Sequence, residues 1–516
     1  MASIGLSIPA LLAVLFGYFL LKLRQNRRKI RDLQKAGLDM PADHSFIWGH
    51  LPLMAEAQKP YPRTATHDYG VAALGKPFTN GLFYIDTWPF SLPLLVVRTP
   101  TAANVLQKYS AGLLKPDDVN GPLDTLCAGS SMMTMKEETW KQWRVLFNPS
   151  FSITYLTQLA PTVAGEVRIF LREAEAGRKA SGTTMGHQHK DHPIAATIRS
   201  QAKWISFSPI VEPWTMLNPK RPFILWNNNR LFKKHIGAEI DKRFAEVKAN
   251  TKEKTKAKAL LPAALESYIS DAQSRGKPSD RLDKDFKSSL ISNMIIFMVA
   301  GHETSSTTIC LAIHSLATHP DYLARIRAEH DAVFGTDTST AHIMSVVEQE
   351  PERLNQLPYT LAVIKETLRL YPPVSGIRMG ASSVTLPDDS GKLFPTDGIK
   401  IWTNHTAMHQ NEKYWPEPER FIPDRFLAKE GDHLYPVKGA WRPFEHGSRN
   451  CIGQALALIE LKLVLVMTMR EFDFEPGYSK EDGEVFGSKA WITGNQGVGG
   501  TPSKECPVRI RLANRF

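Results

Sequence analysis

Apolar residues recur along most of the chain at the spacing of amphipathic α-helices, with polar residues between them. Residues 80–105, which contain the apolar run 93–97, and residues 375–405, which are divided by proline, aspartate and glycine, instead predict short strands. The helical spacing predicts helices over residues 135–175, 228–250, 258–275, 284–318, 320–334, 357–370 and 453–471. Alternating strand–helix units are not evident, so we expect a mainly α fold with small β-sheets in one large domain.

The N-terminus combines an uncharged apolar stretch with a basic run. Residues 1–21 carry no charge, and about 20 apolar residues suffice to cross a bilayer core. The basic residues that follow are Lys22, Arg24, Arg27, Arg28, Lys29 and Arg31. Positive charge stays on the cytosolic side, so we predict a single transmembrane anchor over 1–21 with the remaining chain in the cytosol. A cleaved signal peptide, the alternative, has its basic residues before the apolar stretch.

Composition and charge restrict the remaining possibilities. The 516 residues include four widely separated cysteines and no CxxC pair, which argues against a disulfide framework or a zinc site of that kind. The net charge of +11 could indicate nucleic acid, acidic lipid or an acidic protein partner. No nucleic-acid-binding motif is recognisable, and the basic run explains part of the excess. Residues 178–192 hold His187, His189 and His192, whose spacing fits a solvated loop better than a metal site.

The segment PFEHGSRNCIGQ (443–454) carries the strongest chemical signal. It contains F-x-x-G-x-R-x-C-x-G, formed by Phe444, Gly447, Arg449, Cys451 and Gly453. Cys451 precedes a predicted helix, whose N-terminal amides should lower the thiol pKa and favour a metal-ligating thiolate. The glycines allow a flat group to approach the backbone, Arg449 can bind an acidic substituent, and Phe444 can shield the sulfur. A structural cysteine would explain Cys451 but not its companions, so we expect haem with an axial cysteine.

At these residues the sequence resembles the cytochrome P450 superfamily. The resemblance implies the cytochrome P450 fold, with residues 63–516 as the catalytic domain behind a basic stop-transfer segment and linker at 22–62. It implies haem b (iron protoporphyrin IX) as cofactor, with the Cys451 thiolate as axial ligand. Glu366 and Arg369 match the family's E-x-x-R motif, and Arg420 lies in a match to its P-E-R-F motif at 418–421. By resemblance, these three residues form a buried triad that holds the loop before Cys451.

Further motifs appear in the order of the family. Residues 300–305, AGHETS, match [AG]-G-x-[DE]-T-[TS] within the predicted helix 284–318. A bond from the Thr304 hydroxyl to the carbonyl of Ala300 would bend that helix and make room for water. Glu303 and Thr304 are therefore the expected catalytic residues, which relay protons during oxygen activation. Trp140 and Arg144 match W-x-x-x-R, and by resemblance they and Arg378 bind the haem propionates.

The resemblance also implies the function and the partners. It is closest to fungal microsomal members of secondary metabolism, which implies a monooxygenase in the endoplasmic reticulum membrane. Electrons would come from NADPH-cytochrome P450 reductase, with cytochrome b5 as a further donor. The glycine-rich stretch 494–500 lacks the following helix of a dinucleotide site. We expect a hydrophobic substrate, either a polyketide or a terpenoid, while fatty acids, xenobiotics and a haem-thiolate protein without oxygenase activity remain as alternatives.

Two expectations concern the substrate pocket and the helical core. Residues 127–135, 204–226 and 375–377 should line the pocket, with Met132, Met133, Phe223 and Trp226 as apolar candidates. Relatives usually have an additional apolar segment between the helix that ends near residue 176 and the stretch that begins at residue 192. Here only the polar residues 178–192 lie between them.

Overall fold

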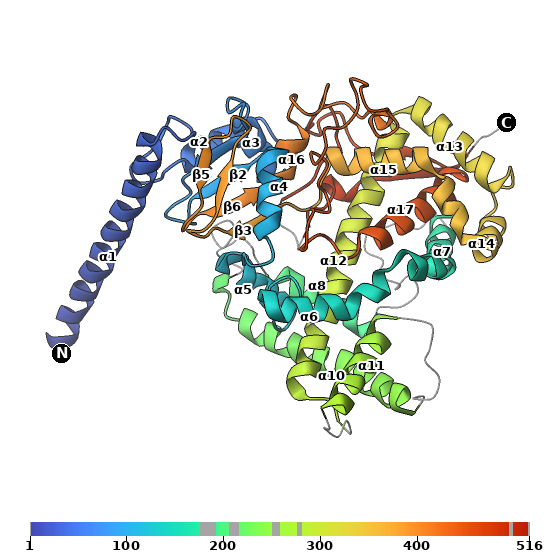
Figure 1. Ribbon diagram of the computed structural model, residues 1–516, viewed down its shortest axis with the longest axis horizontal. Helices are drawn as coiled ribbons and strands as arrows, with labels where there is room; N and C mark the ends of the chain where they lie inside the picture. Colours follow the sequence, from blue (N-terminus) through green and yellow to red (C-terminus); the bar gives the residue numbers. More distant parts are fainter. Residues whose placement is uncertain are drawn as a thin grey trace.

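The computed structural model describes residues 2–175, 192–205, 216–249, 259–275, 281–494 and 499–513. Figure 1 shows a helical body with small sheets at one side, from which a long N-terminal helix projects. The helices are α1 (Ala2–Lys35), α2 (Leu51–Gln58), α3 (His67–Leu74), α4 (Pro100–Tyr109), α5 (Asp117–Leu126), α6 (Glu137–Phe147), α7 (Ile153–Glu175), α8 (Pro193–Lys203), α10 (Arg221–Ala249), α11 (Leu260–Ser274), α12 (Lys284–Ala317), α13 (Pro320–Phe334), α14 (Thr340–Gln349), α15 (Pro358–Leu370), α16 (His405–His409) and α17 (Gln454–Met469). The prediction of a mainly helical fold with small sheets is confirmed.

The main sheet has the strand order β1-β2-β6-β3. β1 (Leu82–Ile85) pairs antiparallel with β2 (Leu94–Val97), which pairs parallel with β6 (Lys400–Thr403). β6 also pairs antiparallel with β3 (Gly376–Met379), so strands from both ends of the chain form one sheet. Two antiparallel pairs lie outside it, β4 (Thr385–Pro387) with β5 (Leu393–Pro395) and β7 (Phe472–Pro476) with β8 (Val508–Leu512).

Two of the predicted elements are divided in the structure. The helix expected over 135–175 is interrupted by a short 3-10 helix at Asn148–Phe151, because Pro149 cannot continue an α-helical hydrogen-bond ladder. The strand-like region 80–105 contains β1 and β2 but ends in helix α4. Pro100 occupies the first turn of α4, where its missing N–H costs nothing, and the Thr99 side chain caps the helix.

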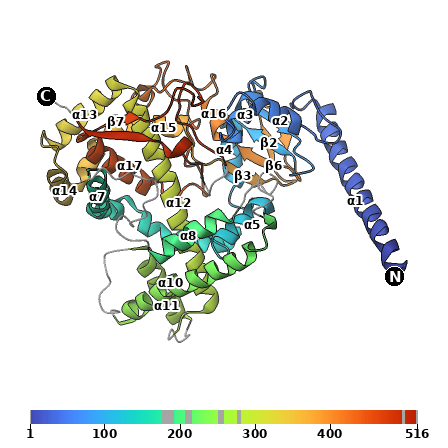
Figure 2. The same cartoon turned by 180° about the vertical axis from the view of Figure 1, so that it is seen from behind.

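Helix α12 forms the axis of the core. It crosses the centre of the body in Figures 1 and 2 and packs against α10, α15 and α17. Within the described part of the chain, α12 is the helix long and apolar enough to cross a membrane by length and composition. Leu290, Ile295 and Leu311 on it are completely buried, so α12 is the core helix of the body.

The expected linker at 22–62 is largely helical. Helix α1 continues to Lys35, and its second half packs against the sheet through Leu23, Ile30 and Leu33, which are buried. Its first half extends away from the body, as both Figure 1 and Figure 2 show. The basic run therefore does more than follow the apolar stretch: part of it belongs to the folded body.

Candidate functional site

Cys451 lies at the end of a loop that leads into α17. The loop is closed by a bond of 2.9 Å from the amide of Cys451 to the carbonyl of Phe444. Gly447 has φ +81°, and a Cβ there would lie 3.1 Å from Gln107, so both the backbone and the space favour glycine. The amides of Gly453 and Gln454, at the start of α17, are hydrogen-bonded to the Cys451 thiol.

The electrostatics of Cys451 differ from the sequence expectation. Those two amides and the nearby Arg144 lower the thiol pKa, as expected for a helix N-terminus. Burial acts in the opposite direction and is the larger effect, so the pKa of Cys451 lies above its usual value. The prediction of a lowered pKa was wrong for the protein without a bound cation, because desolvation outweighs the helix terminus.

A cavity of about 300 Å³ opens beside Cys451, between its loop and α12. Its apolar wall includes Met132, Met133, Phe297 and Phe444. A larger cavity of about 540 Å³ lies elsewhere, between the end of α12 and the segment 476–489. Cys451, Thr304 and the motif arginines Arg144, Arg378 and Arg449 line the smaller cavity, which identifies it as the candidate active site.

Four cations converge on one side of this cavity: Lys115, Arg144, Arg378 and Arg449. Arg144 donates to the carbonyl and side chain of Asn450 at 2.9 and 2.8 Å. The Arg449 guanidinium lies 4.0 Å from the centre of the Trp140 ring and donates to two backbone carbonyls. Its Nε is buried and has no partner among the described residues.

These cations are under electrostatic strain. Burial lowers the pKa of Lys115 well below its usual value, and Arg378 and Arg449 lower it further by repulsion. Burial, and then repulsion by Arg378 and Arg144, lowers the pKa of Arg449 to about 10, although Glu137 acts in the opposite direction. Like charges that lie close together and are partly withdrawn from solvent are stabilised by an anion between them. Among the described residues that line the cavity, Glu445 is the one carboxylate, and it already pairs with His405 and Arg442.

The residues present therefore fit a flat, apolar cofactor that carries acidic groups on one edge. Cys451 offers a thiol, the methionines and phenylalanines offer apolar surface, and the cations offer charge for carboxylates. This donor set fits a haem whose iron is held by a thiolate. Lys115 was missed in the sequence, since an isolated lysine in a turn carries no motif.

The two expected catalytic residues occupy different positions. Thr304 lines the cavity, and its hydroxyl donates to the carbonyl of Ala300 at 2.7 Å, the bond expected from the sequence. Glu303 points to the C-terminal segment, where its carboxylate accepts from the amide of Gly499 at 3.2 Å. Glu303 is therefore close to the cavity through the backbone of α12 but is not part of its wall.

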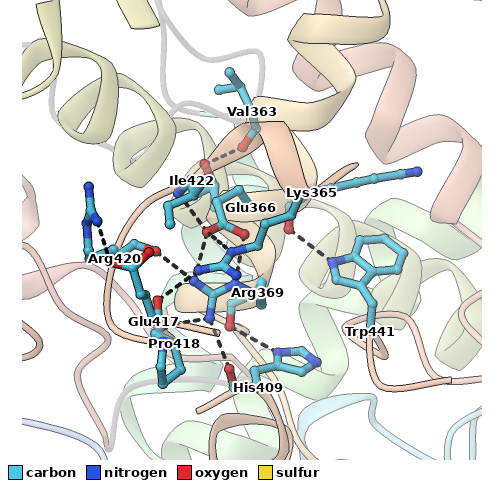
Figure 3. A network of polar contacts seen from close by, with 12 residues as sticks. Val363, Lys365, Glu366, Arg369, His409, Glu417, Pro418, Arg420, Ile422 and Trp441 are labelled. Carbon is cyan, nitrogen blue, oxygen red and sulfur yellow. Dashed lines mark hydrogen bonds and ion pairs between the residues drawn. The ribbon is translucent and has the colours of Figure 1, made fainter. Parts of the chain in front are cut away.

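The buried triad contains a different arginine from the one expected. Glu366 and Arg369 on α15 are completely buried and form a two-bond ion pair at 2.7 and 2.8 Å (Figure 3). The second guanidinium at Glu366 belongs to Arg425, also completely buried, at 3.3 Å. Arg420 is exposed and pairs with Glu417, and Figure 3 shows its guanidinium directed away from Glu366. The prediction of Arg420 was wrong.

The reason lies in a repeated motif. The segment PERFIPDRF contains two P-x-R-F sequences, 418–421 and 423–426, which are offset by five positions. The second forms the 3-10 helix η3 (Pro423–Phe426), which packs against α15. Arg420 contributes through its backbone instead, because its carbonyl accepts from Arg369 at 2.9 Å. Either match was possible in the sequence, and only the packing of η3 distinguishes them.

The expected pocket lining is correct in part. Met132, Met133, Ser375 and Gly376 line the cavity. Phe223 and Trp226 do not, since both are exposed on α10. Residues 206–215 and most of 178–192, with His187 and His189, lie outside the described residues. His192 caps α8 by accepting from the amide of Ile194, and the described part of the chain contains no cluster of three or more metal-binding side chains.

Comparison with known proteins agrees with this site. The family model described as cytochrome P450 matches residues 200–487. The cytochrome P450 monooxygenase polC of Polytolypa hystricis is 32% identical over 99% of this chain and 96% of its own length. The cytochrome P450 monooxygenase acrF of Aspergillus aculeatus is 29% identical over 77% of this chain and 85% of its own. Human cytochrome P450 3A7 is 28% identical over 74% of this chain and 77% of its own length.

These matches cover both the Cys451 loop and the α12 motif. They confirm the enzyme class predicted from the sequence, a cytochrome P450 monooxygenase similar to fungal members. The chain belongs to the cytochrome P450 family.

Proposed function

We propose that this chain is a haem-thiolate monooxygenase in which Cys451 is the axial ligand of haem b. The observation that supports it is the convergence of a thiol, a cluster of cations and Thr304 on one apolar cavity. Bound haem would supply the reductive activation of O2 and the transfer of one oxygen atom to a C–H or C=C bond of the substrate. The motif residues would bind this cofactor, as the resemblance implies: Cys451, Arg449, Phe444, Gly447, Gly453, Trp140, Arg144 and Arg378.

Lys115, Arg144, Arg378 and Arg449 would bind the acidic side chains of the cofactor. Burial depresses the pKa of Lys115 and Arg449, and mutual repulsion lowers it further; two carboxylates would relieve that repulsion. The stacking of Arg449 on Trp140 holds that guanidinium at the cavity wall. Trp140 also lines the cavity, so it would both hold Arg449 in place and contact the cofactor itself.

Lys115→Ala is expected to weaken haem retention. A hydrogen bond to a charged group contributes about 1.5–3 kcal/mol, so haem should dissociate on the order of 10- to 100-fold faster. The measurement is transfer of haem from the purified full chain to apomyoglobin. Lys108→Ala, on the exposed side of α4, is the matched control and should release haem at the native rate. Equal rates of haem release for both variants would show that Lys115 does not bind the cofactor.

Thr304 would hold water in the cavity. Its hydroxyl hydrogen is committed to Ala300, so its lone pairs face the cavity and can accept a hydrogen bond from a water molecule. Glu303 would supply protons through water from the side of the C-terminal segment, since its carboxylate accepts from the amide of Gly499. Proton delivery by a positioned side chain typically contributes about 10²–10⁴-fold in rate.

Thr304→Ala should lower the yield of oxygenated product per NADPH consumed by at least about tenfold. NADPH should still be oxidised, because the electron supply does not depend on this hydroxyl. Ser306→Ala is the control, since Ser306 lies two residues away on the same helix and its hydroxyl donates to the carbonyl of Glu303 at 3.2 Å. The measurement is product and NADPH in the same reaction. An unchanged yield in Thr304→Ala would contradict the proposed role.

The electrons would come from NADPH-cytochrome P450 reductase, with cytochrome b5 as a further donor. We propose a single-pass anchor over 1–21 in the endoplasmic reticulum membrane, with residues 63–516 in the cytosol as the catalytic domain. The exposed apolar side chains of α1, Leu11, Leu12, Val14, Leu15 and Phe16, support an anchor. We propose a hydrophobic polyketide or terpenoid of secondary metabolism as substrate, in keeping with the apolar wall of the cavity.

The test is turnover in ¹⁸O2. Microsomes that contain the full chain, with or without a fungal reductase, are incubated with NADPH and a panel of triterpenoids, aromatic polyketides and medium-chain fatty acids. We expect products that carry one ¹⁸O atom and appear only with the reductase. Turnover without the reductase, or products without ¹⁸O, would favour a haem-thiolate isomerase or dehydratase instead.

A further inference from the structure

Two free cysteines that are 196 residues apart in the sequence lie against each other beside α12. Cys310 is on α12, and Cys506 lies between the 3-10 helix η4 (Ser503–Glu505) and β8. The two thiols are hydrogen-bonded to each other, and the Sγ of Cys506 lies 3.5 Å from the carbonyl oxygen of Cys310. A disulfide has an S–S distance of about 2.05 Å, so its formation requires only a short approach of the two sulfurs.

The backbone that leads to Cys506 has an unusual conformation. Lys504, Glu505 and Cys506 have φ angles of +47°, +58° and +53°, in the left-handed region that residues other than glycine rarely adopt. The amide of Cys506 donates to the carbonyl of Ser503 at 2.9 Å, which closes this turn. Such conformations persist only where the surrounding structure holds them, and here the turn brings the Cys506 side chain onto α12.

Residues 499–506, the C-terminal strap, follow one face of α12. The Glu303 carboxylate accepts from the amide of Gly499, and the Thr307 hydroxyl donates to the carbonyl of Gly500 at 3.0 Å. The contact at Cys310 is the third along the helix. Positions 303, 307 and 310 are spaced by four and three residues, so they share one side of α12.

The strap also borders the active-site cavity. A Cβ at Gly499 would lie 3.5 Å from the methyl carbon of Thr304 and 3.5 Å from the carbonyl oxygen of Pro373, and both of these residues line the cavity. The amide of Gly500 donates to the same carbonyl at 2.9 Å. A change in the mobility of the strap would therefore be felt at the cavity wall.

The two thiols differ in reactivity. The hydrogen bond from Cys506 lowers the pKa of Cys310 more than burial raises it. The same bond, and then burial, raises the pKa of Cys506, although the Tyr478 hydroxyl acts in the opposite direction. Cys310 is also the more exposed of the two. A thiolate is the form that attacks an oxidant, so Cys310 should react first and Cys506 second.

We propose that Cys310 and Cys506 are a peroxide-sensitive thiol pair whose disulfide links the C-terminal strap covalently to α12. The proposal is independent of the oxygenase function, because it concerns the two thiols and the strap alone. In a reducing compartment such disulfides are usually transient and redox-sensing. The bond would therefore form when peroxide rises and be reduced again by cellular thiols.

The reaction has two steps. The Cys310 thiolate attacks hydrogen peroxide, so an S–O bond forms, the O–O bond breaks, and the hydroxide that leaves takes up the proton lost by Cys310. Cys506 then attacks the sulfenic sulfur of Cys310, so the S–S bond forms and the S–O bond breaks. The second oxygen leaves as water with the proton of Cys506. Two thiols and one peroxide thus give one disulfide and two water molecules.

Peptide mapping of the native chain tests the bond. The purified full-length holoprotein is reduced, freed of reductant and treated with a small excess of hydrogen peroxide, and its remaining thiols are alkylated before proteolysis. We expect a linked pair of Cys310 and Cys506 peptides at least about tenfold above any pair with Cys127, whose thiol pKa burial raises to about 12. Dithiothreitol should remove the linked pair. Its absence after peroxide, or equal levels of pairs with Cys127, would overturn the proposal.

Single variants test the order of the two steps. In Cys506→Ser, oxidation of Cys310 should stop at the sulfenic acid, which dimedone traps. In Cys310→Ser, Cys506 should remain an unmodified thiol. Cys127→Ser is the matched control and should form the linked pair to the native extent. A dimedone adduct on Cys506 with none on Cys310 would contradict the assigned roles.

Hydrogen exchange tests the effect on the strap. The amides of residues 499–506 should exchange at least about tenfold more slowly in the oxidised native chain than in the reduced one, because the cross-link opposes local opening. Cys506→Ser, treated with peroxide in the same way, is the control and should show no such change. Equal exchange in the two redox states of the native chain would overturn the linkage of the strap. Neither measurement requires turnover, so its failure is distinguishable from failure of the oxygenase function.

Discussion

Cys451→Ala should abolish the strongly red-shifted absorption band of the reduced, carbon monoxide-bound protein and all oxygenase activity. That band requires a thiolate bound to the haem iron, and Cys451 is the cysteine on the wall of the cavity among the described residues. Alanine removes the sulfur with little change of volume, so the loop that Phe444 and Gly447 shape should persist. The measurement is the difference spectrum of full-length protein in microsomes, with protein amount fixed by immunoblot.

Cys127→Ala is the matched control. Cys127 is completely buried outside the cavity, and burial raises the pKa of its thiol to about 12. We expect its variant to retain the band. A band that survives in Cys451→Ala would exclude Cys451 as the ligand and contradict the proposed function. Loss of the band in Cys127→Ala alone would instead identify Cys127, at the end of α5, as the ligand, and would also contradict the proposed function.

Arg425→Ala should prevent the accumulation of folded, haem-containing protein, whereas Arg420→Ala should not. Removal of Arg425 leaves the buried Glu366 carboxylate with Arg369 as its remaining cation, and loss of one partner of a buried pair costs about 3–5 kcal/mol. That is a large fraction of the usual stability of a folded protein. The Arg420 side chain lies at the surface and its carbonyl, which carries the contact to Arg369, is unaffected by the substitution.

The measurement is the yield of the red-shifted band per unit of protein, together with the half-life of that band at 37 °C. A half-life is appropriate because large proteins usually unfold irreversibly. Native values for Arg420→Ala and little or no band for Arg425→Ala are expected. The reverse result would restore Arg420 to the triad and show that the packing of η3 against α15 does not decide the network.

Local pattern was sufficient for much of the fold. The heavily apolar spacing of 284–318 and 453–471 predicted α12 and α17 closely, because long helices depend mainly on residues three and four apart. The motif spacing also placed Cys451 directly before a helix. The sequence pattern gave the wrong arginine where two neighbouring segments share the P-x-R-F motif. It also missed the start of α4, where Thr99 caps a helix and Pro100 begins it within an apolar region.

The pKa of Cys451 is a second property that the local sequence was not sufficient to predict. A helix N-terminus is visible in the sequence, and its amides do lower the thiol pKa. Cys451 is exposed to a cavity whose walls include residues of α6, α12 and α17, and desolvation by these walls is the larger effect and raises the thiol pKa. Lys115 was missed for a related reason, since its role follows from the arginines that the fold brings near it.

The sequence by itself determined the mainly helical fold, the cysteine loop, the hydrogen bond from Thr304 to Ala300 in α12 and the ion pair of Glu366 with Arg369. Each depends on residues that lie within a few positions of one another, where backbone geometry fixes the distance. Only the tertiary structure decided that Arg425 meets Glu366 and that Arg27 meets Asp86. The members of each pair are 59 residues apart, so their contact depends on which segments pack together. A buried charge requires a partner, but the partner's position in the chain is set by the fold.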